Sequence, residues 1–183
     1  MSNIQPTAEE VVAHALEAMF GKPLVTNVFR SMLVEAMIAK ALTPTWKWCA
    51  ADYSSWDFER SDGLRLEVKQ AAARQTWTTV EGRPSKARFD IAHREGAWHG
   101  ALWEPGRRRS AHIYVFAHHP VADPTADHRE PGQWEFYVVC TLALPEAASI
   151  SLAGISRLVR PVRLDGLLAA VGDAATLFAS AQS

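Results

Sequence analysis

Hydrophobic and polar residues alternate one by one along residues 64–69. Because the side chains of a strand change face at every residue, this pattern predicts a half-buried β-strand. The preceding Ser61-Asp62-Gly63 predicts a turn, in which Gly63 can adopt a positive φ. A three-residue hairpin loop ending in such a glycine would place Asp57 opposite Glu67, on the same face as Lys69. We therefore expect two carboxylates and one ammonium group on a polar face, above an apolar face that packs into the core.

Two segments near the N-terminus have the pattern of helices. A capping box formed by Thr7 and Glu10 predicts a helix over residues 7–20. A second helix is expected over about residues 27–42, ending before Thr43-Pro44. Its apolar positions cover a wide face, which is typical of a helix that packs well into a domain.

Strand patterns recur through the rest of the chain. The expected strands cover residues 46–51, 53–59, 64–70, 111–117 and 134–141, with a short one at 89–92. The strands at 111–117 and 134–141 are rich in β-branched and aromatic residues, as central strands are. Residues 119–132 contain many Pro, Asp and His and predict a loop. Helices are expected over residues 155–158 and 164–178, and the stretch between 71 and 110 is otherwise irregular.

This element order predicts an α/β fold, a three-layer α/β/α sandwich with helices on both faces of a central mixed five-stranded sheet. The chain has 183 residues, which is long enough for one domain with a proper core. We expect N-terminal helices over 1–44, the core sheet with long loops over 45–145, and C-terminal helices over 146–183.

The composition of the chain limits the classes of protein to which it can belong. Hydrophobic residues make up 48% of the chain, which is typical of a folded protein, and the net charge is −1, so any contact with nucleic acid must rest on local patches. Cys49 and Cys140 are far apart and predict reduced thiols in a cytoplasmic protein. The N-terminal residues lack the pattern of a signal peptide, and no apolar run approaches the length of a membrane span.

The polar face predicted for residues 57–69 carries the groups that metal-assisted phosphodiester hydrolysis requires. Mg²⁺ prefers oxygen ligands and is usually held by one or two carboxylates together with substrate phosphates. Such an ion polarises the phosphate and lowers the pKa of a bound water. We expect Asp57 and Glu67 to bind Mg²⁺, or Mn²⁺ in its place, and Lys69 to orient that water or to balance the developing negative charge.

Asp57 together with Glu67-Val68-Lys69 resembles the signature of the PD-(D/E)xK nuclease superfamily, whose members have a restriction-endonuclease-like fold. That signature is an Asp near the start of one strand and an acid-x-Lys on the next. Trp56 stands where the family often has Pro, which is not a metal ligand. The resemblance implies the same core fold, a metal-dependent endonuclease and DNA as the substrate. It also points to Glu35, since an acid from the helix before the core sheet often adds or orients a metal ligand in this family.

Several alternatives remain open for this site. A shifted register would bring Asp52 into it in place of Asp57. Gln70 follows the lysine directly, although alternation places it on the other face. The same hairpin could also be an exposed one with a surface Glu–Lys pair, which contributes little to stability. The fold could serve as a non-catalytic module that binds nucleic acid or protein, or the motif could be coincidental in an unrelated α+β domain.

Basic residues are concentrated in two short stretches. They are Arg83, Lys86 and Arg88 in the first and Arg107, Arg108 and Arg109 in the second, with His112 shortly after. We expect both stretches in loops, where they would contact DNA phosphates or simply solubilise the surface. Cutting both strands of a duplex requires two active sites, so a homodimer is expected. The spacing of the seven histidines fits no standard zinc pattern, and the chain has no G-x-S-x-G motif or glycine-rich phosphate loop.

Overall fold

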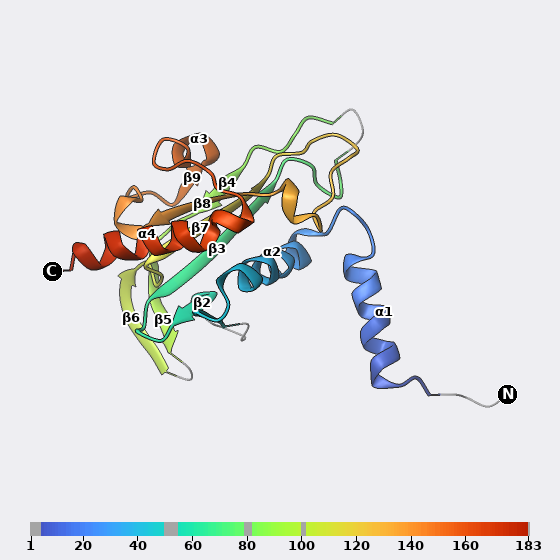
Figure 1. The fold of residues 1–183 in the computed structure, drawn as a ribbon, viewed down its shortest axis with the longest axis horizontal. Coiled ribbons are helices and arrows are strands. Elements are labelled where there is room, and N and C mark those ends of the chain that lie inside the picture. The colour runs from blue at the N-terminus through green and yellow to red at the C-terminus, as the bar shows by residue number, and fades with distance from the viewer. Residues whose placement is uncertain (1–4, 50–54, 79–81, 100–101, 183) are drawn as a thin grey trace.

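The computed structural model describes residues 5–49, 55–78, 82–99 and 102–182. Its centre is a mixed five-stranded sheet with the strand order β1-β2-β3-β7-β8 (Figure 1). The strands are β1 (Trp46–Trp48), β2 (Phe58–Arg60), β3 (Arg65–Ala72), β7 (Ile113–His119) and β8 (Glu135–Cys140). Neighbouring strands are antiparallel except β3 and β7, which are parallel. The predicted mixed five-stranded sheet is therefore confirmed.

The β2–β3 hairpin has the register that the turn chemistry predicts. Phe58 pairs with Leu66, and the N–H of Asp57 donates to the carbonyl of Leu66 over 3.0 Å. Gly63 has a φ of 82°, the left-handed conformation expected at the end of the loop. The ladder ends at Phe58 and Leu66, so Asp57 lies just beyond it, near Glu67.

Long helices cover one face of the sheet. Helix α1 (Ala8–Phe20) begins with the capping box that was predicted, and α2 (Asn27–Leu42) has the expected bounds. Helix α4 (Leu167–Ser180) follows the short 3₁₀ turn η3 (Leu164–Gly166) and lies beside α2. The apolar residues of α2 and α4 pack on Leu66 and Val68 of β3 and on the corresponding positions of β7 and β8. Together they form the larger core of the protein.

The other face of the sheet has a different cover. Strand β4 (Arg88–Asp90) pairs with β9 (Ser149–Ser151), and the single-turn helix α3 (Leu152–Ile155) follows. Phe89 packs edge-on against Phe116 of β7 at 5.2 Å between ring centroids. The expected sandwich had helices on both faces, whereas this layer is mainly a two-stranded sheet with one helical turn. Only three residues of β9 alternate, which is too short a pattern to detect beside the helical signal that follows it.

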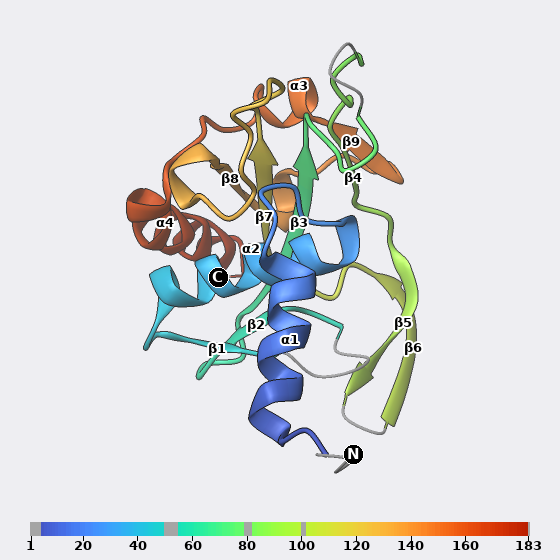
Figure 2. The ribbon, with the colours of Figure 1, turned by 90° about the vertical axis from the view of Figure 1, so that its right-hand side faces the viewer.

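A second correction concerns residues 94–108, which were expected to be irregular. They form a separate hairpin of β5 (Arg94–His99) and β6 (Leu102–Arg108) that extends from the body (Figure 2). Arg107 and Arg108 therefore lie on a strand and not in a loop. Gly96 and Pro105 resemble strand breakers, but they pair with each other next to a β-bulge, where such residues are tolerated. The remaining elements are the 3₁₀ turns η1 (Pro131–Gln133) and η2 (Thr141–Ala143).

Helix α1 projects away from the body, as Figures 1 and 2 both show, and none of its residues is buried. In the described part of the chain, every helix is too short or too polar to cross a membrane.

Candidate active site

Asp57 lies immediately before β2, and both neighbouring strands hold it. Its Oδ2 accepts a hydrogen bond from the backbone N–H of Val68 on β3, over 2.6 Å. Its backbone carbonyl accepts the N–H of Cys49 over 2.8 Å, from the end of β1. The carboxylate is thus oriented by the hairpin backbone and not by a flexible side chain.

Glu67 and Lys69 lie on the face of β3 opposite the larger core. Leu66 and Val68 point toward α2 and α4, so alternation turns Glu67 and Lys69 toward the β4–β9 side. Lys69 Nζ forms a direct ion pair with Glu67 Oε1. Both side chains are largely buried, which distinguishes this pair from an ordinary solvated surface pair.

The groups around Asp57 shift its pKa in opposite directions. Burial first, and then the nearby carboxylates of Glu67 and Glu35, raise the pKa of Asp57 to about 8. The Val68 hydrogen bond and the Lys69 ammonium oppose this shift. A site in which one positive side chain faces several acids has an excess of negative charge, and a bound cation would relieve it.

Glu35 approaches this site from α2. Its Oε2 accepts a hydrogen bond from Trp48 Nε1 over 2.9 Å, and burial is the main reason that its pKa is raised. Within residues 5–49, 55–78, 82–99 and 102–182, no group of three or more His, Cys, Asp and Glu side chains is arranged to hold a metal ion together. Glu35 therefore influences Asp57 through its charge, and its role as a third ligand stays a prediction.

The donor set that remains fits a small hard cation. Asp57 and Glu67 offer carboxylate oxygens from adjacent strands, and Mg²⁺ is commonly held by one or two carboxylates, with water and phosphate oxygens completing its coordination. The excess negative charge around Asp57 favours the same kind of ion.

A small hollow of about 40 Å³ adjoins the polar face. Its lining includes Glu67 and Lys69 together with Asp90, Arg94 and Tyr114. Arg94 donates to Asp90 Oδ2 over 2.5 Å, and both side chains remain about half exposed. Sequence reasoning missed these three residues. The alternation of β7 could have placed Tyr114 on this face, but its position beside Glu67 depends on the parallel pairing of β3 with β7.

Gln70 and Asp52 were the weaker candidates for the site. Gln70 lies on the α2 side of the sheet, where its Oε1 accepts a hydrogen bond from Arg30 Nε over 2.7 Å and its Nε2 donates to Asn27. It is therefore directed away from Glu67 and Lys69, as alternation indicates. Asp52 lies outside the described residues.

The first basic stretch lies near β4, on the same side of the sheet as Glu67. Arg83 and Lys86 are exposed, and Arg88 donates to Ser149 Oγ on β9 over 2.6 Å. This arrangement is compatible with contact to a polyanion, which stays a prediction.

The residues of the second stretch have separate environments. Arg107 is exposed on β6, while Arg108 pairs with Glu104 at 2.8 Å. Arg109 is almost buried and donates to the backbone carbonyls of Ile91 and Pro145, so it braces the fold. His112 accepts the N–H of Arg65 at Nδ1 and packs against Phe178 of α4 at 4.5 Å between ring centroids. The expected joint phosphate surface of residues 107–112 is therefore divided between the two faces of the sheet.

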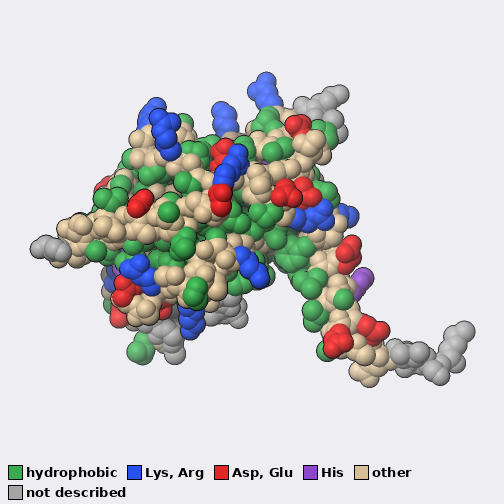
Figure 3. All heavy atoms as spheres, in the orientation of Figure 1, with side chains coloured by type: hydrophobic (Ala, Val, Ile, Leu, Met, Phe, Trp, Pro, Cys, Tyr) green, Lys and Arg blue, Asp and Glu red, His purple; other side chains and the backbone are tan. Residues whose placement is uncertain are grey.

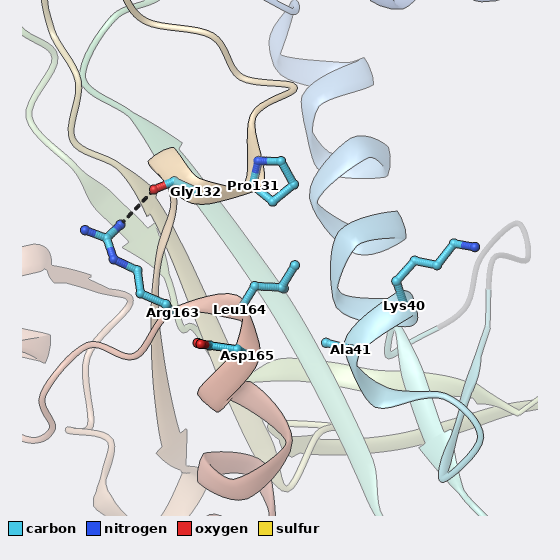
Figure 4. A pocket seen from close by; sticks show the side chains of 7 residues that line it. All are labelled: Lys40, Ala41, Pro131, Gly132, Arg163, Leu164 and Asp165. Carbon is cyan, nitrogen blue, oxygen red and sulfur yellow. Dashed lines mark hydrogen bonds between the residues drawn. The ribbon is translucent and has the colours of Figure 1, made fainter.

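Another hollow is lined by none of the candidate residues. It has a volume of about 650 Å³ and lies between the end of α2, η1 and η3 (Figure 4). Lys40, Arg163 and Asp165 line it, and Arg163 is held by the carbonyl of Gly132 over 3.3 Å. It is an open surface depression, separate from the acidic face.

No protein-family model and no curated protein matches the chain. Among solved structures, the chain is similar to a bacterial homing endonuclease, I-Ssp6803I, with 16% sequence identity and a TM-score of 0.37. The alignment covers 76% of this chain and 86% of that chain. The argument for an activity rests on the residues described above.

Proposed function

We propose that this protein is a Mg²⁺-dependent endonuclease of the PD-(D/E)xK superfamily, with a restriction-endonuclease-like core, and that it hydrolyses phosphodiester bonds in DNA. One observation carries the proposal. The Asp57 carboxylate accepts the N–H of Val68, the residue between Glu67 and Lys69, whose side chains form an ion pair.

Each residue of this trio has a distinct role in the proposed reaction. When bound, Mg²⁺ would polarise the scissile phosphate and lower the pKa of an attacking water. Asp57 and Glu67 would supply the carboxylate ligands, with Glu35 tuning the charge of Asp57 or adding a ligand. Lys69 would hold the attacking water in position and balance the negative charge that develops in the transition state.

The surroundings of the site suit a phosphate-rich polymer. Arg94 borders the hollow beside Glu67, and Arg83 and Lys86 lie exposed near the same layer. Arginine and lysine side chains placed in this way supply sequence-independent affinity for a phosphate backbone. A duplex substrate would be cut in both strands by two copies of the protein.

The test is cleavage of supercoiled plasmid and of a labelled duplex in Mg²⁺ or Mn²⁺, with Asp57→Asn, Glu67→Gln and Lys69→Met. Each substitution should lower the rate by at least about 100-fold, because each removes a ligand or a positioned charge. Asp62→Asn removes a carboxylate of the same hairpin at its exposed turn, away from the hollow, and should leave the rate unchanged.

Metal binding separates catalysis from binding alone. Calorimetric titration with Mn²⁺ should show weak binding that Asp57→Asn and Glu67→Gln abolish and Asp62→Asn retains. Undiminished cleavage in all three site variants would refute the assignment. Metal-dependent DNA binding without cleavage would instead favour the non-catalytic binding module.

A further inference from the structure

Helix α1 carries an apolar stripe that this chain leaves exposed. Val11, Val12 and Leu16 are 54%, 57% and 52% exposed, and with Ala15 and Met19 they follow helical spacing along one side. Glu10, His14 and Glu17 occupy the opposite side, and Glu9 borders the stripe beside Leu16. Figure 3 shows the apolar side chains gathered along the flank of α1 that faces the angle between this helix and the body.

Nothing in the described chain explains why α1 is a stable helix in this position. It has 13 residues and contributes none to the core. Isolated helices of this length are marginal in water, and most helical stability in proteins comes from packing of the apolar face. Phe20, which packs against Phe29 of α2 at 6.2 Å between ring centroids, anchors only the C-terminal end of α1.

A second exposed apolar surface lies on α2, across the angle between α1 and α2. Val28 and Met32, one turn apart on α2, are 74% and 55% exposed. A groove of about 590 Å³ lies at the root of α1, where Met19 of α1 and Phe29 of α2 line it. Its rim includes the basic residues Lys22 and Arg74.

We propose that α1 is a dimerisation arm, and that the α1 helices of two copies of this chain pack antiparallel, each in the angle between α1 and α2 of the other copy. The arrangement is reciprocal, as two-fold symmetry requires. It joins two unpartnered apolar surfaces of the same chain and builds a four-helix cluster from α1 and α2 of both copies. The inference does not depend on the proposed nuclease activity.

The distribution of charge along α1 favours a second copy of the chain as the partner and an antiparallel orientation of the two α1 helices. Glu9 and Glu10 lie in its first turn, and α1 contains no Lys or Arg. In an antiparallel pair centred at Ala15, Val11 of one copy meets Met19 of the other. The acidic first turn then lies beside the groove at the root of the second helix, where Lys22 and Arg74 supply the opposite charge. A small residue at the centre allows the helices to approach closely.

The first experiment is the molar mass of the full chain by sedimentation and by size-exclusion chromatography with light scattering. The wild-type protein should be a dimer at micromolar concentration. Leu16→Asp places a charge in the stripe and should raise the dimer dissociation constant by at least 100-fold. Ala13→Asp places the same charge on the polar side of the same helix and should leave the dimer intact. Because α1 contributes no buried residue, Leu16→Asp should retain the circular dichroism spectrum of the folded body.

The second experiment tests the direction of the pair. In a Cys49→Ala background, Ala15→Cys should form an intermolecular disulfide on mild oxidation, since Cα atoms facing each other at the centre of a close helix pair lie within bridging distance. Ala13→Cys should not cross-link. A monomeric wild-type protein, a dimer that survives Leu16→Asp, or equal cross-linking at positions 13 and 15 would each overturn the proposal.

Discussion

The carboxylate of Asp57 accepts a hydrogen bond from the backbone N–H of Val68, the residue between Glu67 and Lys69. The strand that carries the acid-x-Lys sequence therefore also fixes the orientation of the other acid. A change in the register of the hairpin would break this bond and separate the two carboxylates together. The geometry of the candidate site is thus tied to the turn at Gly63.

Asp57 should make the metal-free protein less stable as the pH rises. Its pKa is raised to about 8, chiefly by burial, so the folded state holds a proton that the unfolded state releases near pH 4. Stability from this group is complete below about pH 4 and is lost as the pH rises through about 8. In EDTA at pH 8, Asp57→Asn should therefore be more stable than the wild-type protein by on the order of 1–3 kcal/mol, as measured by urea unfolding.

The same comparison has two internal controls. At pH 4 most of the difference in stability between Asp57→Asn and the wild-type protein should be gone, since the carboxyl is then neutral in the folded state and about half protonated in the unfolded state. Addition of Mn²⁺ at pH 8 should raise the unfolding midpoint of the wild-type protein but not that of the variant. Parallel stability curves for the two proteins across this pH range would contradict the explanation.

Titration of His128 should make the protein less stable as the pH falls, which is the opposite dependence to that of Asp57. Its Nδ1 accepts the N–H of Val25 over 3.0 Å, so the proton is on Nε2, which donates to the carbonyl of Arg74 over 3.0 Å. Burial first, and then the charge of Arg30, lowers the pKa of His128 to about 4. Stability is complete above about pH 6.5 and falls toward pH 4, by roughly 3 kcal/mol at most for this group.

Urea unfolding between pH 4 and 7 measures this effect. His128→Gln should lower stability at pH 7, because it breaks the contact with Val25, but should flatten the acid slope. The slope should not vanish, since burial also lowers the pKa values of His118 and His119. His14→Gln, on the exposed side of α1, should keep the wild-type slope. An unchanged slope in His128→Gln would remove His128 as its source.

Arg30 should be essential for attaching α2 to the sheet. It is 1% exposed and donates to the side-chain oxygens of Gln70, Gln75 and Asn27 at 2.7 to 2.8 Å. Arg30→Met removes the donor to Gln70 Oε1 and Gln75 Oε1, whereas Asn27 Oδ1 keeps the Gln70 Nε2 donor. This substitution should lower the free energy of unfolding by about 2–4 kcal/mol. Lys40→Met, on the exposed side of the same helix, should change it by less than about 0.5 kcal/mol. Equal effects of the two substitutions would show that the Arg30 network contributes nothing.

Two glycines provide a matched test of the hairpin turn. An added Cβ would meet no atom within 4 Å at either Gly63 or Gly172. Gly63 has a positive φ, so Gly63→Ala should destabilise the protein by about 1 kcal/mol, whereas Gly172→Ala in the interior of α4 should stabilise it by up to about 1 kcal/mol. Thermal unfolding of both variants checks the opposite signs. If both substitutions shifted the midpoint in the same direction, backbone conformation would not be the cause.

The sequence by itself determined the local parts of this protein. The capping box of Thr7 and Glu10 defined the start of α1, and the alternation along residues 64–69 with the turn at Gly63 defined the hairpin and its register. These features depend on contacts between residues close in sequence, so short-range periodicity and turn chemistry are enough to predict them. The register of this hairpin is therefore predictable from the sequence, and it brings Asp57 near Glu67.

The surroundings of that pair were decided by the tertiary structure. The parallel pairing of β3 with β7 brings Tyr114 beside Glu67. The end of β4 brings Asp90 to the hollow, and the start of β5 brings Arg94. The β5–β6 hairpin contains Gly and Pro that local propensity assigns to irregular chain, and cross-strand pairing overrides that preference. Which arginines remain exposed and which, like Arg109, are buried against backbone carbonyls depends on burial, and burial is a property of contacts between residues distant in sequence.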